Sequence, residues 1–124
     1  MKIISTENAP QAIGHYSQAV EMKGMLFISG QIPINPDTKE LVESDIKVQA
    51  NQVMKNLLAV INAADMDISN IAKVTIFIKN MDDFAIINEI YSEYLANHKP
   101  ARAVVEVARL PKDVLIEIDA ICVR

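Results

Sequence analysis

The strand-like segments of this chain carry apolar side chains on both of their faces, which restricts the folds it can adopt. In the segment 71–79 (IAKVTIFIK), Val74 and Ile76 fall on one face and Phe77 on the other. The segment 102–109 (RAVVEVAR) is also apolar on both faces and reads as a buried strand. A strand of this kind needs cover on both sides. The sheet must therefore be packed against something on each face.

The segments expected to be extended alternate with two expected helices. Strands are predicted at 2–5, in two parts of 16–32 with a turn at Lys23-Gly24, at 71–79, at 102–109 and at 114–123. One helix should begin at a Ser44 cap and end near Asp65, and a second should begin at an Asp82 cap. Apolar residues recur at helical spacing in the first helix, at Ile46, Ala50, Val53, Met54, Leu57, Ile61 and Ala64.

This order predicts a single α+β domain spanning residues 1–124, with a mixed sheet and two helices on one face. Two amphipathic helices cover only that face. The most economical cover for the other face is a second copy of the same chain, so the sequence predicts a homo-oligomer.

Composition and charge limit the partners. The net charge is −4 and there is no basic run, so nucleic acid is not an expected partner. No apolar run is long enough to span a membrane, and the N-terminus does not resemble a signal peptide, so we expect a cytoplasmic protein. His15 and His98 lack metal-ligand spacing, and no metal site is expected. Cys122 is expected in the core and not as a nucleophile.

Three polar residues interrupt the apolar pattern. Arg102 opens an apolar strand, and as a structural residue it would pair with Glu117 or Asp119. Glu117 lies on the less apolar face of the last strand, where it would otherwise face solvent or pair with a lysine. Asn88 interrupts the apolar stripe of the second helix, where it could bond to nearby backbone. From the sequence pattern alone, each of the three residues could have one of these structural roles or a role in ligand binding.

Long stretches of the chain resemble one known family. The segments NAPQAIGHYSQAV, FISGQIP, KVTIFIKNMDDFAIINEIY and PARAVVEVARLPKDVLIEIDAICV, in this order, are similar to the Rid (YjgF) family, and specifically to its RidA-type members. The resemblance implies a chorismate-mutase-like fold and a homotrimer with ligand clefts between subunits. It also implies hydrolysis of reactive enamines and imines, such as 2-aminoacrylate, 2-iminopropanoate and 2-iminobutanoate, to 2-keto acids and ammonia. No cofactor is implied.

The resemblance also assigns roles to residues. Arg102 matches the arginine that binds the substrate carboxylate, and Glu117 the acidic residue beside the attacking water. Tyr16 matches a cleft tyrosine that completes the catalytic set. The substrate-binding residues are then Arg102 again, with Ser29, Gly30 and Asn88.

The resemblance leaves two other functions to be weighed. The same cleft in a non-catalytic protein would sense a 2-keto acid or regulate a partner, although the retained Arg102 favours catalysis. A nuclease or translation inhibitor, functions attached to parts of this family, is disfavoured by the acidic composition.

Overall fold

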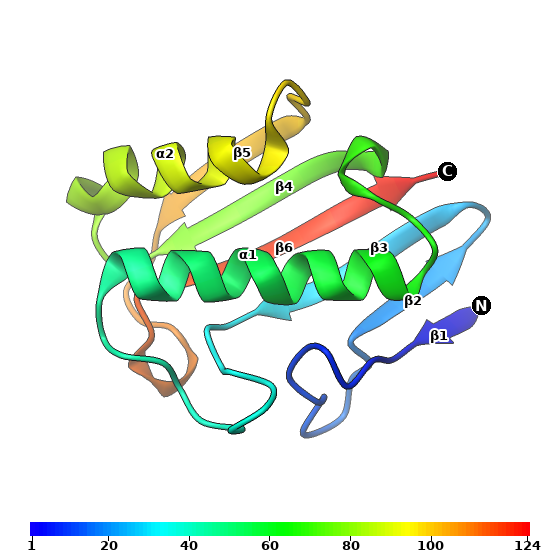
Figure 1. The fold of residues 1–124 in the computed structure, drawn as a ribbon, viewed down its shortest axis with the longest axis horizontal. Coiled ribbons are helices and arrows are strands. Elements are labelled where there is room, and N and C mark those ends of the chain that lie inside the picture. The colour runs from blue at the N-terminus through cyan, green and yellow to red at the C-terminus, as the bar shows by residue number, and fades with distance from the viewer.

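The computed structural model describes residues 1–124 and contains one six-stranded sheet in the order β1-β2-β3-β6-β4-β5 (Figure 1). Neighbouring strands are antiparallel except for β4 and β5, which are parallel, so the sheet is mixed as predicted. The strands are β1 (Lys2–Ile4), β2 (Ala19–Met22), β3 (Met25–Gln31), β4 (Ile71–Ile78), β5 (Ala101–Glu106) and β6 (Ile116–Val123).

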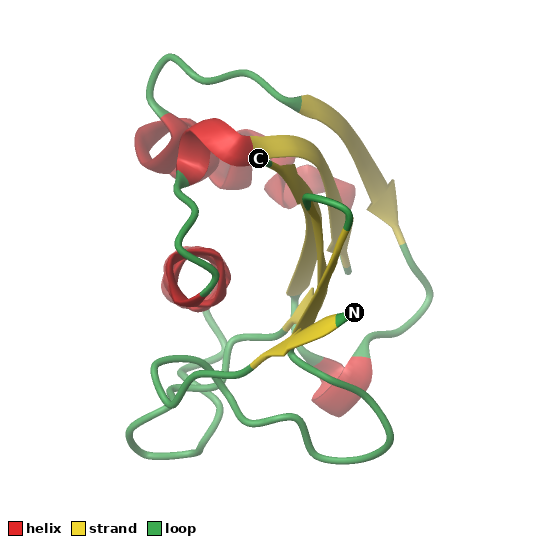
Figure 2. Cartoon of the chain, turned by 90° about the vertical axis from the view of Figure 1, so that its right-hand side faces the viewer, coloured by secondary structure: helices red, strands yellow, loops and turns green.

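Two α-helices, α1 (Ile46–Ala63) and α2 (Phe84–Leu95), lie on the same side of the sheet (Figure 2). Their apolar stripes and one face of the sheet form a single core cluster, which includes Leu57 of α1, Ile87 of α2 and Ile118 of β6. Three short 3₁₀ helices complete the structure: η1 (Ile68–Asn70), η2 (Met81–Asp83) and η3 (Pro111–Asp113). The predicted α+β arrangement with both helices on one face is confirmed. None of the helices has the length and apolar character needed to cross a lipid bilayer.

Both predicted helix caps were misplaced. Asp45, not Ser44, caps α1: its carboxylate accepts hydrogen bonds from the Lys47 and Val48 amides at 2.9 and 3.1 Å. Asp45 has extended backbone and immediately precedes the first helical residue, which is the geometry that a cap requires.

The second helix also begins differently from the prediction. Asn80 accepts a hydrogen bond from the amide of Asp82 at 2.9 Å and so caps η2, which leads directly into α2. Asp82 therefore lies inside a helical turn and caps nothing. The short 3₁₀ segment changed which residue occupies the cap position.

Residues with positive φ lie at the predicted hairpin turn and at the end of the first helix. Lys23 and Gly24 both have positive φ, 52° and 78°, as a two-residue hairpin turn requires. Asp65 has a φ of 57° just beyond the end of α1, at a position where glycine is commonly found.

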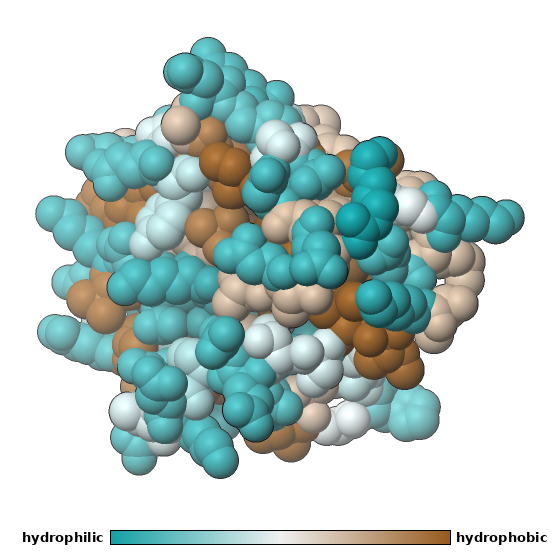
Figure 3. Space-filling model, turned by 45° about the vertical axis from the view of Figure 1, so that its right-hand side comes forward, coloured by the Kyte–Doolittle hydropathy of each residue, from teal (hydrophilic) through white to brown (hydrophobic).

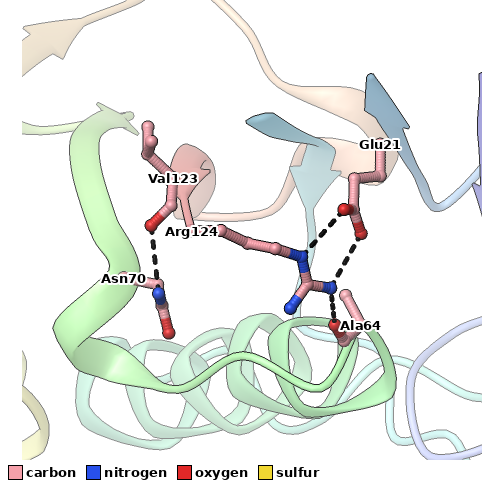
Figure 4. A network of polar contacts seen from close by, with 5 residues as sticks. All are labelled: Glu21, Ala64, Asn70, Val123 and Arg124. Carbon is pink, nitrogen blue, oxygen red and sulfur yellow. Dashed lines mark hydrogen bonds and ion pairs between the residues drawn. The ribbon is translucent and has the colours of Figure 1, made fainter. Parts of the chain in front are cut away.

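Arg124 forms hydrogen bonds to both the end of α1 and the sheet (Figure 4). Its guanidinium donates from Nε and Nη2 to the carboxylate of Glu21 on β2, at 2.9 and 3.0 Å. Nη2 also donates to the carbonyl of Ala64, the C-cap of α1, at 2.6 Å. One side chain thus satisfies a carbonyl at the end of the helix and a carboxylate of the sheet.

The sheet face away from the helices keeps apolar side chains in contact with solvent. Phe27, Val105 and Val123 are each about two-fifths exposed, at 40%, 42% and 41%. On the side shown in Figure 3, hydrophilic side chains cover most of the surface and apolar ones form smaller groups. The strand β5, predicted to be buried, is a partly exposed edge strand, because in one chain nothing covers its outer side.

Candidate functional site

The site residues predicted from the sequence form two groups on opposite faces of the sheet. In the strand register, Arg102 lies beside Val74, a buried residue of the helix-covered face. Glu117 lies beside Phe77, which belongs to the uncovered face. Because side chains alternate along a strand, these registers place Arg102 and Glu117 on different sides of one sheet.

Arg102 contacts α2 and no acidic residue. Its Nη1 donates to Oδ1 of Asn88 at 2.8 Å. The guanidinium carbon lies 5.5 Å from the ring centroid of Phe84 and 5.1 Å from that of Tyr91, within the range of cation–π contacts. The structural pairing with Glu117 or Asp119 is not formed, and Asn88 binds a side chain rather than the backbone.

A cavity of about 440 Å³ adjoins Arg102 between the second half of α2 and the loop that leads into β5. It is lined by Arg102 and Asn88 together with Tyr91, His98 and Lys99, among others. The ring of His98 is anchored by a 2.7 Å hydrogen bond between Nε2 and the carbonyl of Ile71. The cavity wall is therefore polar and carries positive charge from Arg102 and Lys99.

The second group surrounds Glu117, whose side chain lies against the backbone of Gly30. A Cβ added to Gly30 would lie 2.8 Å from Cδ of Glu117 and closer still to its Oε2. Only glycine permits this approach without displacing the carboxylate. The pairing of β3 and β6 shifts register between Ile28 and Gln31, beside this contact, and such irregularities commonly redirect side chains next to functional sites.

The carboxylate of Glu117 has no cationic partner in the chain. Neither Lys73 nor Lys79 forms a salt bridge with it, and Lys79 instead donates to the carbonyl of Ala108. Burial, and secondly the negative charge of Asp119, raise the pKa of Glu117 above its ordinary value. A half-buried, unpaired carboxyl of raised pKa is suited to accept and return a proton.

Asp119 lies two residues along the same strand and has different surroundings. Burial raises its pKa, but the hydroxyl of Thr75 and the positive charge of Lys73 oppose that change. Thr75 is its neighbour on β4. Asp119 therefore has local partners for its charge, and Glu117 has none.

Tyr16 and Ser29 border the same cavity as Glu117 and Gly30, which has a volume of about 590 Å³. Tyr16 is 55% exposed at its rim. The hydroxyl of Ser29 donates to the carbonyl of Ser17 at 2.6 Å, and the Ser29 amide donates to the carbonyl of Gln18 at 3.0 Å. In this chain Ser29 therefore fixes the segment that carries Tyr16.

Four buried carboxamides form a supporting shell that the sequence analysis missed. They are Gln18, Gln31, Gln49 and Asn56, and no acidic or basic side chain is equally buried. Each binds main chain at or next to the cavity beside Glu117. Gln18 accepts from the amide of Thr6 and donates to the carbonyls of Thr6, Ala9 and Pro10.

The other three amides also bind main chain at or near this cavity. Asn56 of α1 donates to the carbonyls of Ile32 and Ile34, at 3.1 and 2.9 Å. Gln49 accepts from the amide of Leu115, just before β6, and Gln31 donates to the carbonyl of Ser29. These neutral groups satisfy buried backbone without adding charge beside Glu117. The sequence signal that could have revealed these four residues is an amide at a helix or strand position that is otherwise apolar.

The remaining reactive groups stand apart from the two cavities. Cys122 is buried in the core, and burial raises the pKa of its thiol to about 11, so it is a packing residue as predicted. No group of three or more histidine, cysteine, aspartate or glutamate side chains is arranged to hold a metal ion.

The chain thus has an α+β fold that presents an arginine without an acidic partner and an unpaired carboxylate at separate cavities. Residues 6–124 match the family model described as Endoribonuclease L-PSP. The chain therefore belongs to this family, which is the Rid (YjgF) family that the sequence resembles.

Individual relatives cover nearly the whole chain. A RutC family protein of Pyrococcus horikoshii is 54% identical over 99% of this chain and 98% of its own length. The 2-iminobutanoate/2-iminopropanoate deaminase of Escherichia coli is 50% identical over 99% of this chain and 98% of its own. The structure of E. coli TdcF with bound serine superimposes with a TM-score of 0.95 at 46% identity, covering 100% of this chain and 99% of that one.

Proposed function

We propose that this protein is a hydrolase of the 2-iminobutanoate/2-iminopropanoate deaminase type, which converts reactive imines and their enamine tautomers to 2-keto acids and ammonia. Relatives that carry this name are about 50% identical to it over 99% of the chain. The observation that carries the proposal is the pair of opposite charges without ionic partners, Arg102 and Glu117, each at the wall of a cavity.

The two groups must be brought together for one small substrate to use both. They lie on opposite faces of one sheet, and apolar side chains remain exposed on the uncovered face. We infer that a second copy of the chain covers that face and that the working site combines Arg102 of one copy with Glu117 of another. A homotrimer, as the family resemblance implies, provides three equivalent clefts of this kind.

In this site the guanidinium of Arg102 binds the substrate carboxylate through two parallel hydrogen bonds, which fixes orientation as well as charge. The imine carbon is then held for attack by water. With the imine nitrogen protonated, Glu117 orients the water and takes one of its protons as the C–O bond forms, giving a neutral carbinolamine. Glu117 then returns that proton to nitrogen and takes the hydroxyl proton as the C=O bond forms and the C–N bond breaks, so that ammonia leaves and the 2-keto acid remains.

The other residues of the larger cavity shape the site. The backbone of Gly30 and the ring of Tyr16 line the cavity beside Glu117. The requirement for acceleration is modest because the substrate is already electrophilic, so positioning supplies much of the effect. No step needs a metal ion or an organic cofactor.

The direct test generates 2-iminopropanoate in situ and follows release of pyruvate. Arg102→Ala should lose roughly 2–5 kcal/mol of transition-state stabilisation while remaining folded, because it removes one partner of a charged hydrogen-bonded pair. Arg102→Lys keeps the charge but not the bidentate geometry, and its activity should fall between those of the parent and Arg102→Ala. Parent-like turnover by Arg102→Ala would contradict the assignment of Arg102.

Three further measurements test the alternative functions and the assembly. Binding of a 2-keto acid without any imine hydrolysis would favour the sensing function. Because the family model carries the description of an endoribonuclease, incubation with single-stranded RNA is the matched control, and no cleavage is expected. Light scattering should give the mass of a trimer, and a monodisperse monomer at micromolar concentration would contradict the composite site.

A further inference from the structure

Arg102 is held by three side chains from one face of α2. Phe84, Asn88 and Tyr91 follow one another at intervals of four and three residues, so they lie on the same side of the helix. The two rings lie 5.5 and 5.1 Å from the guanidinium carbon, and the amide oxygen of Asn88 accepts from Nη1 at 2.8 Å. The guanidinium is thus in contact with two rings and one amide from the same face of α2.

All three groups are uncharged. The salt bridges of the chain join Arg109 to Asp113 and Arg124 to Glu21, and none involves Arg102. A carboxylate in place of Asn88 would hold the guanidinium more tightly but would also cancel its charge. A neutral amide and two rings orient the group and leave its charge intact.

The other two arginines of the chain show which edge of the guanidinium remains free. Arg109 and Arg124 each bind a carboxylate through Nε and Nη2, with distances between 2.7 and 3.1 Å. On Arg102 the only hydrogen bond from the side chain uses Nη1. The Nε–Nη2 edge, which takes the carboxylate in both internal examples, is unoccupied by protein groups.

We propose that Phe84, Asn88 and Tyr91 form a neutral cradle that orients Arg102 before ligand binding and directs its free Nε–Nη2 edge to the ligand carboxylate. This proposal rests on the proposed function, which assigns Arg102 as the carboxylate anchor. Fixing the side chain in advance avoids ordering a flexible arginine during binding. The three cradle residues are positioning residues, because they act through Arg102.

The charge argument is tested with Asn88→Asp, which preserves size and places an anion beside Nη1. The measurements are the Kd of pyruvate by calorimetry and the KM and kcat of imine hydrolysis, with the assembled parent protein as reference. We expect pyruvate affinity to fall about tenfold or more, and more than in Asn88→Ala, because an intramolecular carboxylate competes with the ligand.

A pH series separates this competition from simple structural damage. Acidification neutralises the carboxylate that Asn88→Asp introduces, so the ratio of the variant's Kd to that of the parent should shrink toward one. The titratable or charged groups beside the cradle are Tyr91, His98, Lys99 and Arg102 itself, joined in the proposed assembly by Glu117 of a neighbouring copy. They are present in both proteins and cancel in the ratio. A ratio that stays high at low pH, or no loss at neutral pH, would overturn the charge argument.

The ring contacts have their own pair of variants. The hydroxyl of Tyr91 is buried and has no hydrogen-bond partner, so Tyr91→Phe removes nothing that holds Arg102. Tyr91→Leu removes the ring and should raise the KM by roughly two- to thirtyfold with a smaller change in kcat. Tyr94→Leu is the control on the same helix, because the hydroxyl of Tyr94 bonds Asn51 and its ring makes no cation–π contact with Arg102. Equal behaviour of the Leu and Phe variants at position 91 would reject the ring's role.

Failure of the cradle and failure of the proposed function give different results. If Arg102→Ala binds pyruvate as the parent does, the carboxylate anchor itself is wrong. If Arg102→Ala loses affinity but Asn88→Asp and Tyr91→Leu keep it, the anchor stands and the cradle is rejected.

Discussion

The carboxylate of Glu117 lies against the backbone of Gly30, at a point where even a methyl group would displace it. A Cβ on Gly30 would come within 2.8 Å of the Glu117 Cδ. The two residues are on neighbouring strands, β3 and β6, next to an irregularity in their pairing. The position of the proposed proton-transferring group is therefore set by the absence of a side chain on the adjacent strand.

Gly30→Ala should lower turnover while leaving the protein folded. The atoms that block the new methyl group belong to the flexible end of Glu117, so the carboxylate will move and the backbone need not. A displacement of about 1 Å in a positioning group can cost around a hundredfold in rate. The measurement is kcat for imine hydrolysis, together with the melting temperature.

Gly24→Ala is the matched control for this variant. Nothing lies within 4 Å of a Cβ at Gly24, but its φ is 78°, so an alanine there is strained. We expect a loss of stability of about 1 kcal/mol and parent-like turnover. If Gly30→Ala lowers only the stability, and Gly24→Ala lowers the turnover, then Gly30 does not set the position of the Glu117 carboxylate.

Glu117→Gln and Asp119→Asn should separate the two carboxyls of β6. Glutamine keeps the size of Glu117 but cannot accept a proton, so turnover should fall by roughly 10²- to 10⁴-fold with a smaller effect on pyruvate binding. Asp119→Asn should keep near-parent turnover, because the local partners of Asp119 are Thr75 and Lys73. Full turnover of Glu117→Gln, or loss of turnover in an intact Asp119→Asn oligomer, would contradict these roles.

Glu117→Gln should also change how stability depends on pH. Burial raises the pKa of Glu117 in the folded chain, so the folded state binds this proton more tightly than the unfolded state does. As pH rises from the ordinary value of 4.5 through the raised pKa, the parent loses stability that the glutamine variant keeps. The variant should therefore melt at a higher temperature at neutral pH, and this advantage should vanish below pH 4.5.

Melting curves of the parent and the variant across this range provide the check. A variant less stable than the parent at neutral pH would mean that a cation brought by a neighbouring copy outweighs the effect of burial. That result would contradict the prediction.

Arg124→Met should destabilise the fold without changing the chemistry. The variant loses the hydrogen bonds to Glu21 and to the carbonyl of Ala64, which join α1 to the sheet and involve no residue that lines either cavity. We expect a lower melting temperature and parent-like kcat and KM. A double-mutant cycle with Glu21→Gln gives the coupling between the two side chains.

The same ion pair has a defined pH dependence. Its hydrogen bond to Arg124 is the main reason that the pKa of Glu21 lies below its ordinary value. The stabilisation is present above the ordinary glutamate pKa and is lost as pH falls through the lowered one. The stability difference between parent and Arg124→Met should shrink accordingly in acid, and a constant difference would argue against the ion pair as its source.

Local patterns in the amino-acid sequence were sufficient to predict the order of the elements, the α+β class and the face that each β6 residue occupies. These follow from periodicity, because a strand repeats every two residues and a helix about every 3.6. The family's segments also identified the candidate residues, including Arg102 and Glu117. Local rules failed at the helix starts, where Ser44 and Asp45 are adjacent cap formers and the path of the chain selects one.

The placement of these residues relative to one another depends on the assembled sheet. The strand order puts β5 at the edge and β6 inside, and the register puts Arg102 and Glu117 on opposite faces although each is the second residue of its strand. The contact of Gly30 with Glu117 joins residues far apart in the chain, and the buried amides bind remote main chain in the same way. Such contacts depend on which strands become neighbours and in which register, and packing of the whole sheet fixes both, because a shift of one residue would turn every side chain to the other face.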